Sequence, residues 1–347
     1  MRIKLAQQFF VLNTLWVILT LTAFAILINL SWWQLNRATE KTAQLARVAE
    51  LQAAGALQPS QLSRLAASDI DAAPLQGQGR WLAPYIWLLD NQIVDGKVGF
   101  TGGVGIAPQW TGRAQDPAHW RDTHFQVEGP AVAQMQSVFI DNWIKVTGDV
   151  LHGPDYFPAL APAGPAFAQM FSSSPSGGSE SMQLMYLLAI TAASRSIDLS
   201  AAYFVPDELT LQALTEALKR GVKLRIVVPG EHIDSDAVRN ASRATWGPLL
   251  KAGATIAEYE PTMYHCKLMI VDGLLTSVGS TNFDNRSFRL NDEATLNIVD
   301  RAFASAQTTT FEADLALARP VTHAQWLARP VSERFGEWLA SVMGTQL

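Results

Sequence analysis

A histidine and a lysine two positions apart, His265 and Lys267, are the residues whose spacing points most directly to chemistry. They begin an apolar stretch that predicts a strand over 265–271, so both side chains should project from one face of it. A basic pair is unfavourable inside an apolar core, because a buried charge needs a partner. The same pair is favourable where it converges on an anion. The spacing therefore predicts an anion-handling site.

Neutral hydrogen-bonding residues follow the next predicted strand, at Gly279, Ser280 and Asn282. Ser280 and Asn282 can donate to the same anion, and we expect Gly279 and Ser280 to contact substrate. Glu293 lies further along the chain and can accept the second N–H of the His265 ring, which would hold the imidazole in one tautomer.

Asp272 completes the pattern. It has the opposite strand parity from Lys267, so we expect it to support the site without touching the anion. A lone His-x-Lys pair is common by chance, but the full spacing H-x-K-x4-D-x6-G-S-x-N is highly specific. Cys266, between the basic pair, should face the core.

This pattern resembles the HKD motif of the phospholipase D superfamily, and its surroundings resemble the cardiolipin synthases over about residues 96–347. Tyr203 to Asp207 and Arg220 to Val222 are among the matching segments. The resemblance implies an α/β fold, a duplicated sandwich in which sheets are flanked by helices. Two halves would pack about a pseudo-twofold axis, and each would contribute one HKD motif to a single site.

The resemblance also implies phosphodiester cleavage through a covalent phosphohistidine. One histidine attacks phosphorus, a second protonates the leaving alcohol, and an acceptor alcohol or water then attacks. No metal or organic cofactor is expected, because lysine and asparagine supply the electrostatic stabilisation. The substrates would be anionic phospholipids at a membrane. The catalytic set carried over is His265, Lys267, Asp272, Asn282 and Glu293.

The first half departs from this pattern. Aligning Asp95 and Gly102-Gly103 with Asp272 and Gly279-Ser280 predicts a histidine at 88 and a lysine at 90, where the chain has Leu88 and Asp90. A chain with one motif should be impaired as an enzyme. A homodimer that brings two copies of His265 together is an alternative.

The N-terminal region is apolar from Phe9 to Trp33, about the length of one membrane-spanning helix. The run is long for a signal peptide, the competing interpretation, and no small-residue cleavage site follows it. We expect a single-pass anchor in a bacterial-type inner membrane. Residues 1–100, including WLLDNQ at Trp87 to Gln92, resemble a Surfeit-type cytochrome c oxidase assembly protein, which favours a periplasmic body and suggests a chimeric chain.

Four segments are predicted: an anchor over 1–35, a truncated assembly-like segment over 36–95, an incomplete first half over 96–171 and a second half over 180–347. Ser172 to Ser179 reads as a linker. Asp207 should cap a helix that runs to Arg220, and another helix should cover 235–251. Short apolar strands alternate with these helices, as in an α/β sheet. The C-terminal Trp326, Phe335 and Trp338 are expected to pack a helix onto the body, with contact to a membrane surface as the alternative.

Composition limits the alternatives. A net charge of −5 gives no reason to expect nucleic acid as a partner, so a nuclease is the weaker option within the superfamily. With one cysteine there is no intrachain disulfide. The alternative from another class is a non-enzymatic membrane protein that assists cytochrome c oxidase assembly.

Overall fold

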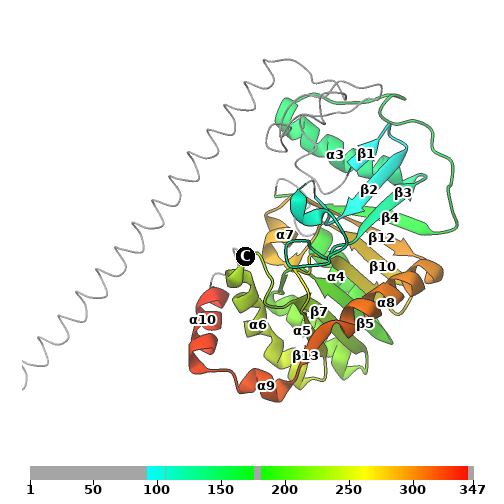
Figure 1. Ribbon diagram of the computed structural model, residues 1–347. Helices are drawn as coiled ribbons and strands as arrows, with labels where there is room; N and C mark the ends of the chain where they lie inside the picture. The colour runs from blue at the N-terminus through cyan, green and yellow to red at the C-terminus, as the bar shows by residue number, and fades with distance from the viewer. Residues whose placement is uncertain (1–91, 106, 176–180, 343–347) are drawn as a thin grey trace, which may run out of the picture. The chain divides into compact units, whose positions relative to one another are not determined.

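The structure, a computed structural model, describes residues 92–105, 107–175 and 181–342 (Figure 1). The first element of this part is a three-stranded antiparallel sheet. It contains β1 (Gln92–Val94), β2 (Val98–Gly102) and β3 (His124–Glu128) in the order β1-β2-β3. The helix α3 (Ala131–Thr147) packs on it through Val132 and Met135. A side chain at Gly99 would collide with Met135, because an added Cβ would lie 2.4 Å from its Sδ.

The second sheet has eight strands in the order β13-β8-β7-β5-β9-β10-β12-β4. Parallel pairing links β5, β7 and β8, and the remaining neighbours are antiparallel. The strands are β4 (Phe167–Ser173), β5 (Ser196–Ala201), β7 (Lys223–Pro229), β8 (Thr255–Tyr259), β9 (Lys267–Val271), β10 (Leu275–Gly279), β12 (Glu293–Val299) and β13 (Ala318–Val321).

Helices cover both faces of this sheet, so its central strands are buried on both sides. One face packs against α4 (Ser181–Ala192), α5 (Glu208–Lys219) and α6 (Asp236–Lys251). The other packs against α8 (Arg301–Ala316), in a cluster that also includes residues of α3. The two parts of the fold therefore share a continuous core.

The two helices predicted to end at Arg220 and to cover 235–251 are confirmed. Asp207 caps α5 by accepting a hydrogen bond from the backbone N–H of Thr210, and Ser235 caps α6 through Val238. Two predictions are wrong at their boundaries. The predicted linker over 172–179 begins later, because β4 continues to Ser173 by pairing with β12. The strand predicted from His265 begins at Lys267.

The two sheets repeat one hairpin. Asp95 and Asp272, 177 positions apart, both have a left-handed backbone, with φ values of 52° and 56°. The glycines that follow them, Gly96 and Gly273, do too, at 65° and 59°. The pairing of Val94 with Val98 in the first hairpin matches that of Val271 with Leu275 in the second. The structure thus repeats β1-β2-β3-α3 as β9-β10-β12-α8.

Short elements complete the described part: η3 (Pro108–Trp110), β6 (Phe204–Val205), β11 (Phe283–Asp284), α7 (Asn285–Arg289), α9 (His323–Leu327) and α10 (Val331–Val342). Among the helices in the described ranges, none has the length and apolar character needed to cross a membrane. The predicted span, Phe9 to Trp33, lies outside those ranges, as do Leu88 and Asp90.

Candidate active site

His265 lies just before β9, where the two halves of the fold meet. Its backbone N–H donates to the carbonyl of Arg121 at 2.8 Å, and the N–H of Arg121 donates to Met263 at 2.9 Å. These bonds form a parallel bridge between Arg121 and Tyr264. The backbone of the first half therefore fixes the position from which the imidazole projects.

The His265 ring is held by Asp122. Its Nδ1 lies 2.7 Å from Oδ2 of Asp122, whose side chain is only 1 % exposed. The indole Nε1–H of Trp110 donates to the same oxygen at 3.3 Å, and the N–H of Thr123 donates to Oδ1 at 2.7 Å. A carboxylate accepts hydrogen bonds, so Nδ1 is the donor in this contact, and in the neutral ring the lone pair is then on Nε2.

The contact between Asp122 and His265 requires a glycine at position 103, because the Asp122 carboxylate lies against its backbone. A Cβ added at Gly103 would lie 2.4 Å from Oδ2 of Asp122, so only glycine leaves room for the carboxylate. Two indole rings enclose the imidazole, with ring centroids 5.7 Å away for Trp110 and 5.3 Å for Trp120. Asp122, Trp110 and Trp120 were not nominated as site residues from sequence, because their role depends on contacts between the halves.

Lys267 meets the same ring. Its Nζ lies 3.1 Å from both Nδ1 and Nε2 of His265 and donates to the carbonyl of His265 at 2.9 Å. An ammonium equidistant from both ring nitrogens faces the ring rather than one in-plane lone pair. The structure thus brings the predicted basic pair together, at a point where an anion could contact both.

Glu293 does not bind His265, so the predicted tautomer-holding role is wrong. Its carboxylate accepts hydrogen bonds from Ser280 Oγ at 2.6 Å, Ser287 Oγ at 2.9 Å and Asn291 Nδ2 at 3.1 Å. Burial raises the pKa of Glu293 to about 7, although the three donors act to lower it. The neighbouring carboxyl of Asp284 raises it further.

Ser280 and Gly279, predicted to contact substrate, both have contacts within the fold. The one hydroxyl proton of Ser280 is directed to Glu293, so it is not available to an anion. Gly279 allows close packing of β10 on β12, since a Cβ there would lie 2.3 Å from the carbonyl oxygen of Ala294. Asn282 follows β10, and its buried Oδ1 has no hydrogen-bond partner among the described residues.

Asp272 lies at the opposite end of β9 from Lys267 and does not join the basic pair. It accepts hydrogen bonds from the backbone N–H groups of Ser194, Arg195 and Ser196, and from the Ser194 hydroxyl at 2.7 Å. Its carboxylate fixes the loop that leads into β5. This geometry accords with the supporting role predicted for Asp272 and gives no ground for a catalytic one.

Asp122 and Glu293 occupy equivalent positions in the two halves. Gly102 pairs with His124 in the first sheet and Gly279 pairs with Thr295 in the second, so counting back two residues from each partner reaches these carboxylates. Asp122 holds an imidazole from the other half. Glu293 instead accepts hydrogen bonds from Ser280, Ser287 and Asn291 of its own half.

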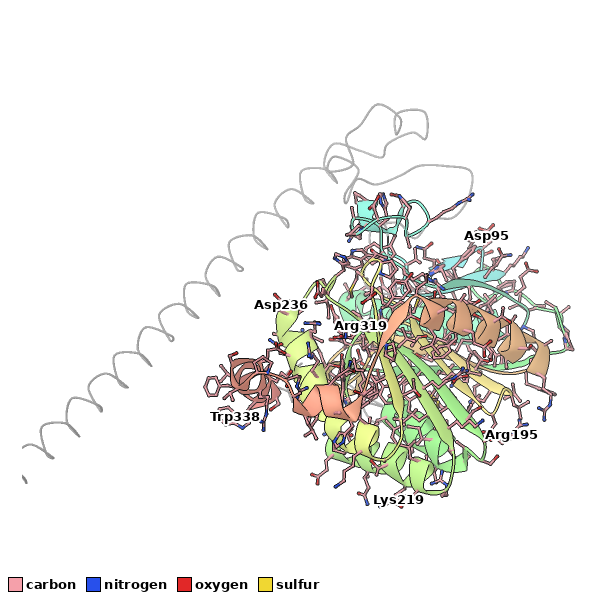
Figure 2. All side chains as sticks on the ribbon, turned by 60° about the horizontal axis from the view of Figure 1, so that its bottom comes forward. Asp95, Arg195, Lys219, Asp236, Arg319 and Trp338 are labelled. Atoms are coloured by element: carbon pink, nitrogen blue, oxygen red, sulfur yellow. The ribbon has the colours of Figure 1, made fainter. Side chains whose placement is uncertain are left out.

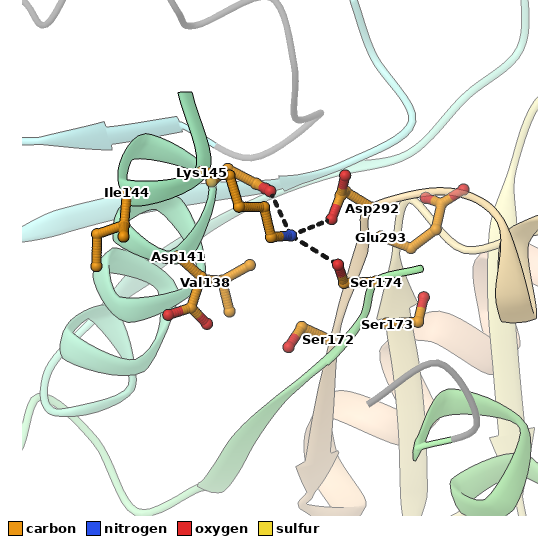
Figure 3. A pocket seen from close by; sticks show the side chains of 10 residues that line it. Val138, Asp141, Ile144, Lys145, Ser172, Ser173, Ser174, Asp292 and Glu293 are labelled. Carbon is orange, nitrogen blue, oxygen red and sulfur yellow. Dashed lines mark hydrogen bonds and ion pairs between the residues drawn. The ribbon is translucent and has the colours of Figure 1, made fainter. Parts of the chain in front are cut away.

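Two ion pairs repeat the symmetry with reversed charge. Arg121, just before Asp122, binds Asp314 near the end of α8 through two hydrogen bonds of 2.8 Å. Asp292, just before Glu293, binds Lys145 near the end of α3 at 2.7 Å. Lys145 and Glu293 line a pocket of about 370 Å³ with Ser172, Ser173 and Ser174 (Figure 3).

Comparison with known proteins separates two regions. Residues 186–315 match the family described as cardiolipin synthase, PLD-like domain, where PLD denotes phospholipase D. Residues 186–315 form a phospholipase D-like domain. Residues 21–107 match the SURF1 family. The chain is therefore a chimera of segments similar to two different families.

Curated relatives agree with this division. The cardiolipin synthase of Geobacillus thermodenitrificans is 35 % identical over 257 residues, which cover 74 % of this chain and 51 % of that protein. The major cardiolipin synthase of Bacillus subtilis is 34 % identical over 253 residues, 72 % of this chain and 52 % of that protein. The chain spans about half the length of these relatives.

A solved structure supports the fold. The phosphatidylserine synthase of Haemophilus influenzae superposes with a TM-score of 0.57 at 13 % identity, covering 74 % of this chain and 70 % of that one. The α/β phospholipase D-like architecture predicted from sequence is confirmed, whereas the N-terminal transmembrane helix stays a prediction.

Proposed function

We propose that this chain is a phosphatidyltransferase of the phospholipase D superfamily, similar to cardiolipin synthases and impaired because one of two catalytic motifs is incomplete. The observation that supports it is the hydrogen bond from Nδ1 of His265 to Asp122, with Lys267 against the same ring. The substrates proposed are anionic phospholipids in a membrane.

The geometry favours His265 as the nucleophile. With Nδ1–H held by Asp122, the lone pair of Nε2 can attack phosphorus and form an N–P bond while the P–O bond to the leaving alcohol breaks. The ammonium of Lys267 stabilises the charge that develops on the non-bridging oxygens. An acceptor alcohol then attacks phosphorus, the N–P bond breaks, and the proton of the alcohol passes to the group that protonated the first leaving alkoxide.

A second acid is needed to protonate the leaving alkoxide, on the opposite side of phosphorus from His265. By the 177-position offset of the repeated hairpin, position 88 corresponds to His265 and position 90 to Lys267. The chain has Leu88 where this acid would be and Asp90 where the second lysine would be. The offset also aligns Asn282 with Gly105, so the first half lacks the amide as well. Loss of an acid–base partner lowers rates by about 10²–10⁴-fold.

Restoring the first motif tests the proposal. The full chain, Leu88→His with Asp90→Lys, and the same pair with Gly105→Asn are assayed for phosphatidyl transfer between phosphatidylglycerol molecules. A Cβ at Gly105 would lie 3.1 Å from the Trp110 ring, so the third change requires that ring to move. We expect activity only after restoration, and loss of that activity with His265→Ala. Robust activity in the parent chain that His265→Ala abolishes would refute the impairment.

The same proposal places the chain in a bacterial-type inner membrane through Phe9 to Trp33, with the catalytic part periplasmic. Carbonate extraction should leave the chain in the membrane pellet, and protease added to spheroplasts should reach the body. Recovery in the carbonate supernatant would exclude the anchor.

A second candidate function follows from the match of residues 21–107 to the SURF1 family. A non-enzymatic protein that assists oxidase assembly should co-purify with oxidase subunits, and His265→Ala should not affect that association. The match includes β1 and β2, which belong to the repeated hairpin of the phospholipase D-like fold. Because β1 and β2 repeat the geometry of β9 and β10, these two strands favour the phospholipase D-like function over the assembly function.

A further inference from the structure

The helix α10 (Val331–Val342) carries its large apolar side chains on the outside. Val331 is 79 % exposed, Phe335 61 %, Trp338 58 % and Leu339 55 %. Their spacing of four, three and one residues places them on one stripe of the helix. Figure 2 shows α10, with Trp338 labelled, at the margin of the described part of the chain. Trp326, by contrast, packs inward against Gly247, so only one of the three predicted packing residues has that role.

The inward face of α10 is polar and small. Glu337 is buried and forms ion pairs with Arg329 at 3.0 Å and Arg243 at 3.5 Å. Glu333 adds a contact of 3.5 Å to Arg243. A helix at a protein surface ordinarily buries its apolar stripe and exposes charge. Here charge pairing fixes the helix, and the apolar stripe is left for another partner.

The place of α10 connects it to the candidate site. Ala340 packs with Val205 and Val238 in one cluster. Val205 lies on β6, whose partner strand β11 (Phe283–Asp284) directly follows Asn282. The stripe therefore lies on the helix that flanks the edge of the fold where Asn282 emerges.

We propose that the stripe of Val331, Phe335, Trp338 and Leu339 inserts into the surface of an anionic lipid bilayer, with α10 parallel to the membrane plane. Tryptophan, phenylalanine and leucine on one side of a short helix are the composition of interfacial helices. Arg334, exposed beside Phe335, can reach the lipid phosphates.

The exposed area of the stripe is too small for a second copy of the chain to bind it stably. An aromatic side chain contributes at most about 250 Å² and an aliphatic one less, and the exposed fractions of these four lie between 55 % and 79 %. The stripe thus falls well below the roughly 800 Å² per partner that a stable dimer buries. A bilayer needs no complementary protein surface, so a narrow stripe is sufficient.

Depth-dependent fluorescence tests the proposal on the full chain reconstituted in phosphatidylglycerol-containing vesicles. Cys266 is buried, so a single introduced cysteine takes an environment-sensitive NBD label. Phe335→Cys and Leu339→Cys report on the stripe, and either suffices if the other fails to fold. Phe167→Cys is the matched control, because Phe167 is 79 % exposed and begins β4, at the sheet edge opposite to β13.

We expect labels at 335 and 339 to emit at shorter wavelength and to be quenched several-fold more by head-group-proximal doxyl lipids than the label at 167. Labels on the stripe as accessible to aqueous iodide as the control would overturn the proposal. Shielding from iodide without quenching by lipid would also overturn it, and would assign the stripe to protein. The readout needs no turnover, so its outcome is independent of the proposed enzymatic function.

Discussion

Nδ1 of His265 lies 2.7 Å from Oδ2 of Asp122, although 143 positions separate the two residues in the chain. The contact joins the second half of the fold to the first. In the proposed mechanism this contact leaves Nε2 as the reactive nitrogen, and it exists because Arg121 and Tyr264 form a parallel bridge one residue away on each side. An incomplete first half therefore still positions the one imidazole of the motif.

Replacing Asp122 with asparagine should impair catalysis with little change in shape. The amide presents either a neutral oxygen or an N–H to Nδ1, so the preferred tautomer of His265 is weakened or reversed. In the chain with its first motif restored, we expect phosphatidyl transfer to fall by about 10²–10⁴-fold. Asp116→Asn is the control, because Asp116 forms its ion pair with His119 and not with His265. Equal activity of the two variants would remove Asp122 from the mechanism.

Removing Arg121 should destabilise the interface between the halves. Its side chain and that of Asp314 are 19 % and 9 % exposed, and Arg121→Ala would leave a largely buried carboxylate without its partner. We expect the free energy of unfolding to fall by about 3 kcal/mol in urea titrations of the detergent-solubilised chain. Lys219→Ala, which breaks the exposed pair with Glu216, should cost less than about 0.5 kcal/mol. A similar small cost for both would show that the pair does not secure the interface.

Asp272 should matter for stability, not for binding an anion. Burial acts to raise its pKa, but the N–H of Ser196 and the donors of Ser194 and Arg195 outweigh it and lower the pKa to about 2. Its stabilising contribution is therefore present above the ordinary value of 3.8 and is lost as pH falls toward 2. Asp272→Asn should cost about 1 kcal/mol at pH 7, with the difference shrinking below pH 4. Weakened binding of inorganic phosphate by a stably folded variant would contradict a purely structural role.

Local signals predicted much of the second half. The caps at Asp207 and Ser235 and the apolar runs of β7 and β8 act over a few residues, so the sequence was sufficient for them. The role of Asp122 depends on a contact across 143 positions, which periodicity cannot reveal. Counting the 177-position offset back from Glu293 reaches Asp116 instead, so the equivalence of Asp122 and Glu293 becomes visible only in the strand pairing of Gly102 and Gly279.

Orientation of α10 was the other feature that sequence left open. A 3.6-residue period indicates which side chains share a face, but not which face turns inward. Phe335 and Trp338 were expected to pack on the body because apolar faces usually do. Ion pairs from Glu337 to Arg243 and Arg329 decide the matter instead, and those arginines lie on separate segments of the chain.

The raised pKa of Glu293 provides a pH-dependent test of its buried hydrogen bonds with Ser280, Ser287 and Asn291. Burial raises its pKa to about 7 from an ordinary value of 4.5, so between these values the folded chain binds more protons than the unfolded one. The free energy of unfolding must then fall as pH rises through this window, by about 1.4 kcal/mol per pH unit at most. Glutamine at this position does not titrate. Relative to the parent, the free energy of unfolding of Glu293→Gln should therefore rise by up to about 3 kcal/mol between pH 5 and pH 8.

Urea titrations at several pH values measure this difference, and the contribution of Asp284, which is present in both chains, cancels to first order. Glu216→Gln, at a half-exposed position, is the control substitution. A constant difference between Glu293→Gln and the parent across the window would mean that Glu293 is ionised throughout and that its three donors outweigh its burial.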